Sequence, residues 1–147
     1  LVEIGGEVRA RGRNDRNTTW RIGIDKPLEG NMIPGANLQA IIRLRNHSLA
    51  TSGNYRKYYE KGGIKYVHTI NPKTGYPVVS NLLSATVVAD DCMTADAYAT
   101  ALMVFGVEKS ISFLQENKFL EGYLIYADEE GKFRVYSTPG IQKFIGE

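Results

Sequence analysis

The sequence is poor in cysteine and histidine, and it has no long apolar run. Its single cysteine among 147 residues, Cys92, excludes an internal disulfide and a cysteine-rich zinc site. No apolar stretch approaches the roughly 20 residues that a membrane-spanning helix requires. The basic residues are scattered and the formal net charge is only +2, which argues against a nucleic-acid-binding domain. A solvated loop explains the arginines between Arg9 and Arg16.

The chain also lacks an initiator methionine and a signal peptide. Residues 1–6 are mostly apolar and end in two glycines, which is typical of a strand already in progress. We therefore expect the chain to begin inside a larger protein, so the missing signal is uninformative about its compartment. With 43% hydrophobic and 23% charged residues, no internal repeat and no flexible linker, residues 1–147 are predicted to form one globular unit.

Alternating apolar residues, β-branched residues and turn signals predict a protein rich in strands. The predicted strands are residues 1–11 (broken at the two glycines), 19–25, 38–44, 47–52, 55–60, 64–70, 83–89, 122–126 and 133–136. We expect hairpins between 38–44 and 47–52, between 55–60 and 64–70, and between 122–126 and 133–136. The continuous apolar run at 83–89 is typical of a strand buried on both faces.

A change to helical spacing predicts two helices after the 83–89 strand. Small and apolar residues recur on one face of the first helix, residues 92–105, for which Thr94 is the expected N-cap. The second helix is expected at residues 108–117, and a final helical turn between residues 138 and 145. The predicted fold class is α+β, with a mostly antiparallel sheet and two central helices.

Asp96 and Thr100 stand four residues apart in the first predicted helix, so their side chains share one face. A carboxylate and a hydroxyl are hard oxygen ligands, which suit Mg²⁺ completed by water, backbone carbonyls or a substrate phosphate. The structural alternative is that Asp96 favours the positive end of the helix dipole and that Thr100 is an ordinary helix residue. Spacing alone leaves both explanations open.

His68 lies near the end of a predicted strand, where an imidazole can reach a site as a general base. The turn at residues 71–75 has proline early and glycine late, as a tight turn requires. It also offers backbone N–H groups, the Thr74 hydroxyl and the Lys73 ammonium, which would suit an anion. A surface histidine and a plain turn explain the same residues, so these alternatives also stay open. His47 has no such neighbours and is interpreted as structural.

Two further segments place glycine beside polar residues. Residues 50–55 put two hydroxyls and a glycine at the end of a strand, as in a loop that approaches a ligand. Residues 5–7, Gly-Gly-Glu, would do the same or would form only a bulge. Neither segment is specific alone.

Taken in order, four of these segments resemble the C-terminal half of the FAD:protein FMN transferases, the ApbE family. The family's Gly-Gly-acidic, Ala-Thr-Ser-Gly-x-Tyr, His-x-x-Asp-Pro-x-Thr-Gly-x-Pro and Ala-Asp-Ala-x-x-Thr segments stand here at residues 5–7, 50–55, 68–77 and 95–100. The resemblance covers nearly the whole chain and implies the C-terminal part of an ApbE-like fold. Asn71 stands where the family often has Asp, which removes a charge and keeps the turn chemistry.

The resemblance implies Mg²⁺-dependent protein flavinylation. FAD is the implied substrate, and its FMN moiety moves to a Thr or Ser hydroxyl of an acceptor protein with release of AMP. Asp96 and Thr100 are the implied metal ligands, which suits the charge that develops on a cleaved pyrophosphate. His68 is the implied catalytic base. The implied contacts with the flavin nucleotide are His68, Thr69, Ile70 and Thr74.

The family is about twice this length, and its N-terminal half carries much of the FAD pocket and an alanine whose backbone oxygen joins the metal shell. We therefore expect this chain alone to bind flavin weakly and transfer little, and its uncovered edge to favour a homo-oligomer. Two alternatives stay open. One is an FAD pyrophosphatase that yields FMN and AMP, and the other is a non-catalytic flavin-binding or oligomerising module. The resemblance also implies export to the periplasmic side of the bacterial inner membrane, often as a lipoprotein.

Overall fold

The structure, a computed structural model, describes residues 1–28, 31, 33–54, 58–61 and 64–146. Its strands are β1 (Val2–Ile4), β2 (Glu7–Arg9), β3 (Trp20–Asp25), β4 (Leu38–Leu44), β5 (Ser48–Gly53), β6 (Tyr58–Lys61), β7 (Ile64–Val67), β8 (Leu82–Ala89), β9 (Glu121–Ala127), β10 (Phe133–Ser137) and β11 (Ile145–Gly146). Its helices are α1 (Cys92–Phe105), α2 (Val107–Glu116) and a 3-10 turn at Ile141–Lys143. In this part of the chain no helix is long and apolar enough to cross a membrane. The predicted α+β class is confirmed.

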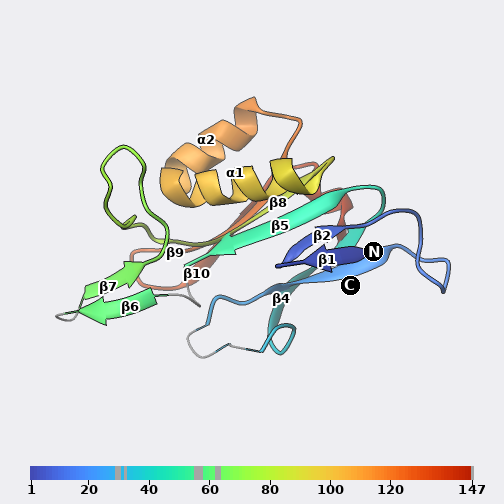
Figure 1. Cartoon of the computed structure of the whole chain (residues 1–147), viewed down its shortest axis with the longest axis horizontal. Coiled ribbons are helices and arrows are strands. Elements are labelled where there is room, and N and C mark those ends of the chain that lie inside the picture. The colour runs from blue at the N-terminus through green and yellow to red at the C-terminus, as the bar shows by residue number, and fades with distance from the viewer. Residues whose placement is uncertain (29–30, 32, 55–57, 62–63, 147) are drawn as a thin grey trace.

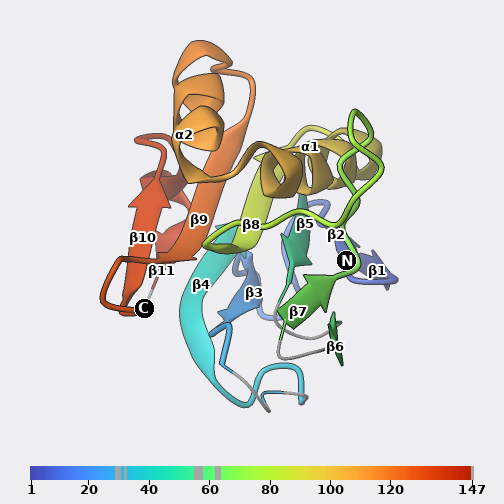
Figure 2. The ribbon, with the colours of Figure 1, turned by 90° about the vertical axis from the view of Figure 1, so that its left-hand side faces the viewer.

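The elements form three layers around a central sheet. This sheet has six antiparallel strands in the order β1-β2-β5-β8-β9-β10. The helices α1 and α2 cover one face of it, and the three-stranded sheet β11-β4-β3 lies on the other face (Figures 1 and 2). Strand β8 lies between β5 and β9 and is buried almost throughout. The prediction that this segment is buried on both faces is confirmed.

Each face of the central sheet has its own apolar core. Small residues at Ala95 and Ala99 let α1 approach the sheet closely, and both are fully buried. On the opposite face, residues of β3 and β4 pack against Leu49, Val88 and Ile125 of the central sheet. Because α1 buries its small and apolar residues against the sheet, its more polar residues are left exposed.

The expected hairpin between residues 38–44 and 47–52 is wrong. Strand β4 pairs with β3 and β11, whereas β5 pairs with β2 and β8 in the other sheet. The chain crosses between the sheets at Asn46, which has a φ of 60° and accepts a hydrogen bond on its side chain from the Gly12 N–H at 2.9 Å. The neighbouring His47 donates from Nδ1 to the Arg45 carbonyl oxygen at 2.8 Å, which agrees with its expected structural role.

The expected N-cap at Thr94 is also wrong, because Asp91 caps α1. The backbone of Asp91 is extended, and its carboxylate accepts hydrogen bonds from the Thr94 N–H at 2.8 Å and the Thr94 hydroxyl at 2.9 Å. These bonds lower the pKa of Asp91. Thr94 therefore lies inside the first turn, where its N–H is one of the donors that a cap must satisfy.

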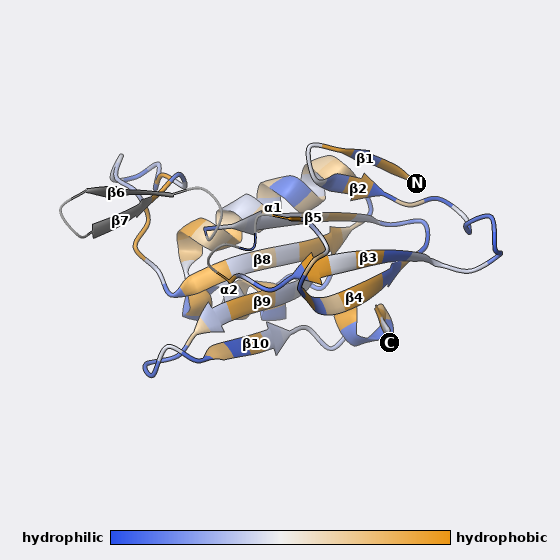
Figure 3. Cartoon of the chain, turned by 90° about the horizontal axis from the view of Figure 1, so that it is seen from below, coloured by the Kyte–Doolittle hydropathy of each residue, from blue (hydrophilic) through white to orange (hydrophobic). Residues whose placement is uncertain are grey.

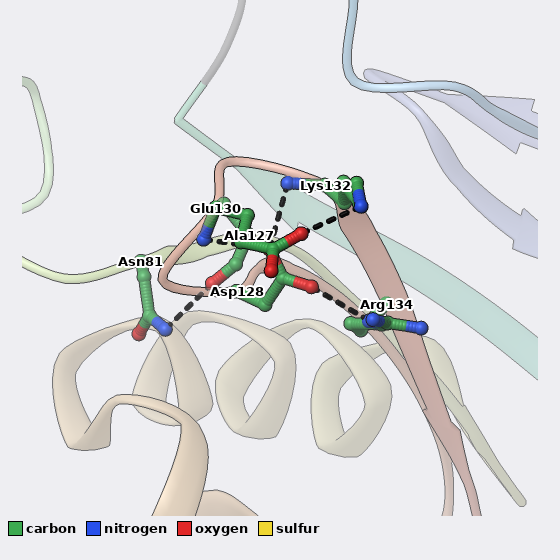
Figure 4. A network of polar contacts seen from close by, with 6 residues as sticks. All are labelled: Asn81, Ala127, Asp128, Glu130, Lys132 and Arg134. Carbon is green, nitrogen blue, oxygen red and sulfur yellow. Dashed lines mark hydrogen bonds and ion pairs between the residues drawn. The ribbon is translucent and has the colours of Figure 1, made fainter.

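The other predicted connections are confirmed. The break at the two glycines separates β1 from β2, and β6 pairs with β7, although residues 55–57 and 62–63 of that predicted hairpin lie outside the described residues. Strands β9 and β10 pair across the predicted turn. There the Asp128 carboxylate accepts from the backbone N–H groups of Glu130 and Lys132 and from Nε of Arg134, at 2.8–3.0 Å (Figure 4). The bond from the Lys132 N–H is the main cause that lowers the pKa of Asp128. Together with the bonds from Arg134 and Glu130 it outweighs the opposing effect of desolvation, so this charged network serves the turn.

Candidate active site

A cavity of about 970 Å³ opens between α1, the β1–β2 hairpin, the end of β5 and strand β3. This volume lies at the upper end of the range for small-molecule pockets. The residues that line it are Glu3, Gly5, Gly6, Glu7, Val8, Arg21, Ile22, Gly23, Ile24, Asp25, Pro34, Gly35, Leu38, Leu49, Thr51, Ser52, Gly53, His68, Asp96 and Thr100. Three of the predicted site residues, His68, Asp96 and Thr100, therefore meet at one cavity from two distant segments.

Asp96 and Thr100 reach the cavity because α1 lies across the strand beside it. The helix packs against β5 and β8 through its small residues, which fixes its rotation about its own axis. Asp96 and Thr100 then stand one turn apart on its exposed side, at the cavity wall. The Thr100 hydroxyl is held by a hydrogen bond of 3.1 Å to the hydroxyl of Ser52 on β5.

The donor set at this wall fits a hard cation held mainly by oxygen. In the described residues, no group of three or more His, Cys, Asp or Glu side chains is placed to hold a metal ion. One carboxylate and one hydroxyl on adjacent helical turns match the partial shells by which Mg²⁺ is held in phosphate-binding enzymes, with water and phosphate oxygens completing the shell. Among the described residues, the cavity wall also carries Glu3, Glu7 and Asp25 against one cationic side chain, Arg21, so the charge of this part of the wall favours a cation.

His68 is exposed and follows directly on the last residue of β7. The residue after it, Thr69, is fixed at two atoms. Its hydroxyl donates to Oδ1 of Asn54 at 3.3 Å, and its carbonyl oxygen accepts from the Val78 N–H at 2.9 Å. The imidazole is therefore carried on a backbone whose next residue is hydrogen-bonded to Asn54, directly after β5, and to Val78, ahead of β8.

The turn after His68 is closed by its own hydrogen bonds. The Asn71 carbonyl oxygen accepts from the N–H groups of Thr74 and Gly75, the Asn71 side chain accepts from the Lys73 N–H, and the Thr74 hydroxyl accepts from the Tyr76 N–H. Gly75 has a φ of +74°, as its place late in the turn requires. These N–H groups already have partners, which favours the structural explanation of the turn over an anion-binding one.

The structure does not bring all of the expected nucleotide contacts together. Of the four, His68 lines the cavity, whereas Thr69, Ile70 and Thr74 are not among the described residues of its wall. Ile70 instead forms a single β-bridge with Pro77, beside the cavity.

Sequence reasoning missed the wall contributed by β3. Residues 21–25 of this strand all line the cavity, and its polar side chains there are Arg21 and Asp25. Asp25 accepts from the Gly35 N–H at 2.9 Å. A Cβ at Gly23 would lie 2.5 Å from a methyl group of Leu38, so a larger residue there would displace Leu38 from the cavity wall. In the sequence, Arg21, Gly23 and Asp25 fall on one face of the predicted strand, which could have indicated a polar cavity wall. Exposure to solvent produces the same kind of polar face, so the pattern was not specific.

Comparison with known proteins places the sequence and the fold in one family. A sequence model described as the ApbE family matches residues 1–124. The chain is 37% identical over 147 residues to an FAD:protein FMN transferase of Vibrio cholerae, covering 100% of this chain and 42% of that one. It is 42% identical over 143 residues to the protein of the same name from Haemophilus influenzae, covering 97% and 40%.

Solved structures agree with these relatives. The flavin transferase ApbE from Vibrio cholerae superposes with a TM-score of 0.80 at 37% identity, over 97% of this chain and 43% of that chain. The apo form of the Pseudomonas stutzeri flavinyl transferase ApbE gives a TM-score of 0.79 at 33% identity, over 99% and 42%. The chain thus spans roughly two fifths of the length of these relatives. It belongs to the ApbE family.

Proposed function

We propose that this chain carries the cation-binding and proton-accepting part of an FAD:protein FMN transferase. In this reaction the FMN moiety of FAD moves to a Thr or Ser hydroxyl of an acceptor protein, and AMP leaves. The observation that supports the proposal is the convergence of His68, Asp96 and Thr100 on one acidic cavity in a member of the ApbE family.

The chemistry of the cavity wall suits a pyrophosphate. A bound Mg²⁺ would neutralise the charge that develops on the phosphate oxygens as the bond between the attacked phosphorus and the bridging oxygen breaks and that oxygen leaves with AMP. Asp96 would hold that cation through its carboxylate and Thr100 through its hydroxyl oxygen. Arg21, which lines the cavity, would bind a phosphate oxygen once the cation compensates the carboxylates.

His68 supplies the remaining requirement. A Thr or Ser hydroxyl is a weak nucleophile until a base accepts its proton, and an imidazole at the mouth of the cavity is suited to that role at neutral pH. Because His68 is exposed, a hydroxyl carried on another protein can approach it. Proton acceptance by His68, attack by the oxygen and departure of AMP then balance as one displacement at phosphorus.

Removal of the carboxylate tests the cation assignment. In the full-length protein, Asp96→Ala should abolish Mg²⁺-dependent FMN transfer and weaken Mn²⁺ binding measured by electron paramagnetic resonance, while Asp90→Ala, an exposed carboxylate before α1, should retain both. Transfer at the normal rate by the Asp96→Ala protein would end the proposal.

Removal of the imidazole separates proton acceptance from binding. His68→Ala should lower kcat by about 10²–10⁴-fold, the usual range for a lost general base, with a much smaller change in the KM for FAD. A raised KM with unchanged kcat would instead make His68 a binding residue.

An assay without acceptor distinguishes transfer from hydrolysis. The protein is incubated with FAD and Mg²⁺ alone, and free FMN and AMP are measured by chromatography. We expect little release until an acceptor with a Thr or Ser hydroxyl is added. Rapid release without acceptor would assign FAD pyrophosphatase activity, and bound FAD without AMP in either condition would assign a non-catalytic flavin-binding module.

A further inference from the structure

The end of β5 touches both halves of the candidate active site. Ser52 is the penultimate residue of this strand, and Asn54 directly follows the strand, so the two are separated by one residue. The Ser52 hydroxyl lies 3.1 Å from the Thr100 hydroxyl on α1. The Asn54 side chain accepts a hydrogen bond of 3.3 Å from the hydroxyl of Thr69, the residue after His68.

Asn54 is suited to hold its neighbour in place because it is itself fixed. Only 6% of its surface is exposed. Its backbone N–H donates to the Leu83 carbonyl oxygen at 3.0 Å, and its amide nitrogen donates to the Leu82 carbonyl oxygen at 3.4 Å. Both acceptors lie at the start of the central strand β8, so the orientation of the amide is set by the sheet and its Oδ1 is directed at Thr69.

This contact restrains the backbone that carries the imidazole. Thr69 is held by Asn54 at its hydroxyl and by Val78 at its carbonyl oxygen. His68 is joined to Thr69 by one peptide bond, so its Cα position follows that of Thr69. The side chain of His68 keeps its own torsions, and the restraint therefore concerns placement and not chemistry.

The contact of Ser52 acts on the other half of the site. When a threonine hydroxyl gives a lone pair to a cation, its proton must go to another acceptor. Ser52 is an acceptor at hydrogen-bond distance, on the sheet side of Thr100. With the proton of Thr100 directed to Ser52, the lone pairs of Thr100 are turned away from the strand and toward the cavity that Asp96 also lines.

We propose that Ser52 and Asn54 are positioning residues, which set the separation between the cation-binding face of α1 and the proton-accepting His68 through one rigid strand. The proposal rests on the proposed function, because it assigns the two contacts to the same reaction. Neither residue touches the reacting atoms in this scheme.

The test compares three variants of the full-length protein. Ser52→Ala should weaken the binding of Mn²⁺ alone, measured by electron paramagnetic resonance, by about 10–100-fold, as for other partners of metal ligands. Asn54→Ala should leave Mn²⁺ binding unchanged and lower kcat for FMN transfer by about 10²-fold with little change in the KM for FAD, because a shifted base misplaces the reaction. The matched control is Asn81→Ala. This variant loses a comparable bond of 2.8 Å, from an amide nitrogen to the backbone oxygen of Ala127 in β9, the strand that flanks β8 on the side away from β5.

Second variants keep the test decisive. Ser52→Thr, which retains a hydroxyl, should recover most of the Mn²⁺ affinity lost in Ser52→Ala. If Asn54→Ala does not fold, Thr69→Val removes the same hydrogen bond with nearly the same shape, and it should reproduce the loss of kcat. Mn²⁺ affinity in Ser52→Ala equal to that of Asn81→Ala would overturn the role of Ser52. Normal kcat in Thr69→Val or Asn54→Ala would overturn the role of Asn54.

The outcome is separable from that of the proposed function. Full transfer activity in Asp96→Ala would contradict the proposed function. Loss of activity in Asp96→Ala, together with Ser52 and Asn54 variants that behave like Asn81→Ala, would remove only the positioning roles.

Discussion

At the scale of single residues, the start of α1 depends on the Asp91 carboxylate. It accepts two hydrogen bonds from Thr94, and these bonds are the main cause of its lowered pKa. A helix whose first N–H groups lack such an acceptor frays at that end. Asp96 lies only five positions beyond this cap, so the same carboxylate orders the first turn of the helix that carries this proposed cation ligand.

The pH dependence of stability should report this cap. Because the folded pKa of Asp91 lies below the unfolded value of about 3.9, its contribution is present above that value and is lost as the pH falls through the folded pKa. In thermal unfolding followed by circular dichroism, Asp91→Ala should have a lower Tm than wild type at neutral pH. Asp91→Asn keeps an acceptor for the Thr94 N–H, so its Tm should fall less at neutral pH and should depend less on pH below 4. An Asp91→Ala protein as stable as wild type would contradict this assignment.

At the scale of elements, the seating of α2 depends on the absence of a side chain at Gly122. A Cβ at this position of β9 would lie 2.4 Å from a methyl carbon of Leu114, which is 1% exposed on α2. The Leu114 side chain of α2 therefore occupies the space that a side chain at position 122 of β9 would need. The contact matters beyond α2 because α1 and α2 are joined through Gly106 and pack on each other.

A double-mutant cycle tests this match. Gly122→Ala should destabilise the protein by about 1–3 kcal/mol through overpacking. Leu114→Ala should cost about 2–5 kcal/mol through the cavity that it leaves. The Ala side chain at position 122 partly fills that cavity, so the double variant should be more stable than the sum of the two effects, by about 0.5–3 kcal/mol. Strictly additive free energies of unfolding, measured with urea, would show that the two residues do not compete for space.

At the scale of the whole molecule, the outer edge of the central sheet is apolar and open. Strand β1 pairs only with β2 among the described strands, and Val2 and Ile4 are 58% and 75% exposed. Figure 3 shows the hydrophobic colour along β1 at the rim of the molecule. An exposed apolar edge strand is a template for pairing with another chain.

This edge predicts concentration-dependent self-association of the 147-residue chain. Sedimentation velocity should show oligomers that grow with concentration, and Ile4→Lys should shift the population towards monomer by placing a charge on the edge. Val79→Lys is the matched control, since Val79 is 95% exposed but lies outside any strand. If both variants associate like wild type, β1 is not the interface.

The local pattern of the sequence was enough to predict most elements. Periods of two and 3.6 predicted most strands and both helices, because burial of one face imposes these periods directly. A continuous apolar run predicted the buried β8, because both of its faces are covered. The local pattern misplaced the N-cap by three residues, since Asp91 and Thr94 are both good capping residues and only the backbone geometry selects one of them. It missed Arg21 and Asp25 because a polar strand face signals solvent as readily as a cavity.

The sequence by itself determined which groups are available for the proposed chemistry: one imidazole, one carboxylate and one hydroxyl in segments of recognisable type and order. The tertiary structure alone decided that β4 and β5 lie in different sheets. Strand β4 pairs with the preceding β3 and with β11, whereas β5 pairs with β2 and β8, and a local pattern does not rank these possible partners. The tertiary structure also decided that His68 meets Asp96 and Thr100 at one cavity, and that the end of β5 contacts both groups. The physical reason is that a side chain's type is local, whereas its separation from a distant residue depends on how the sheets and helices pack.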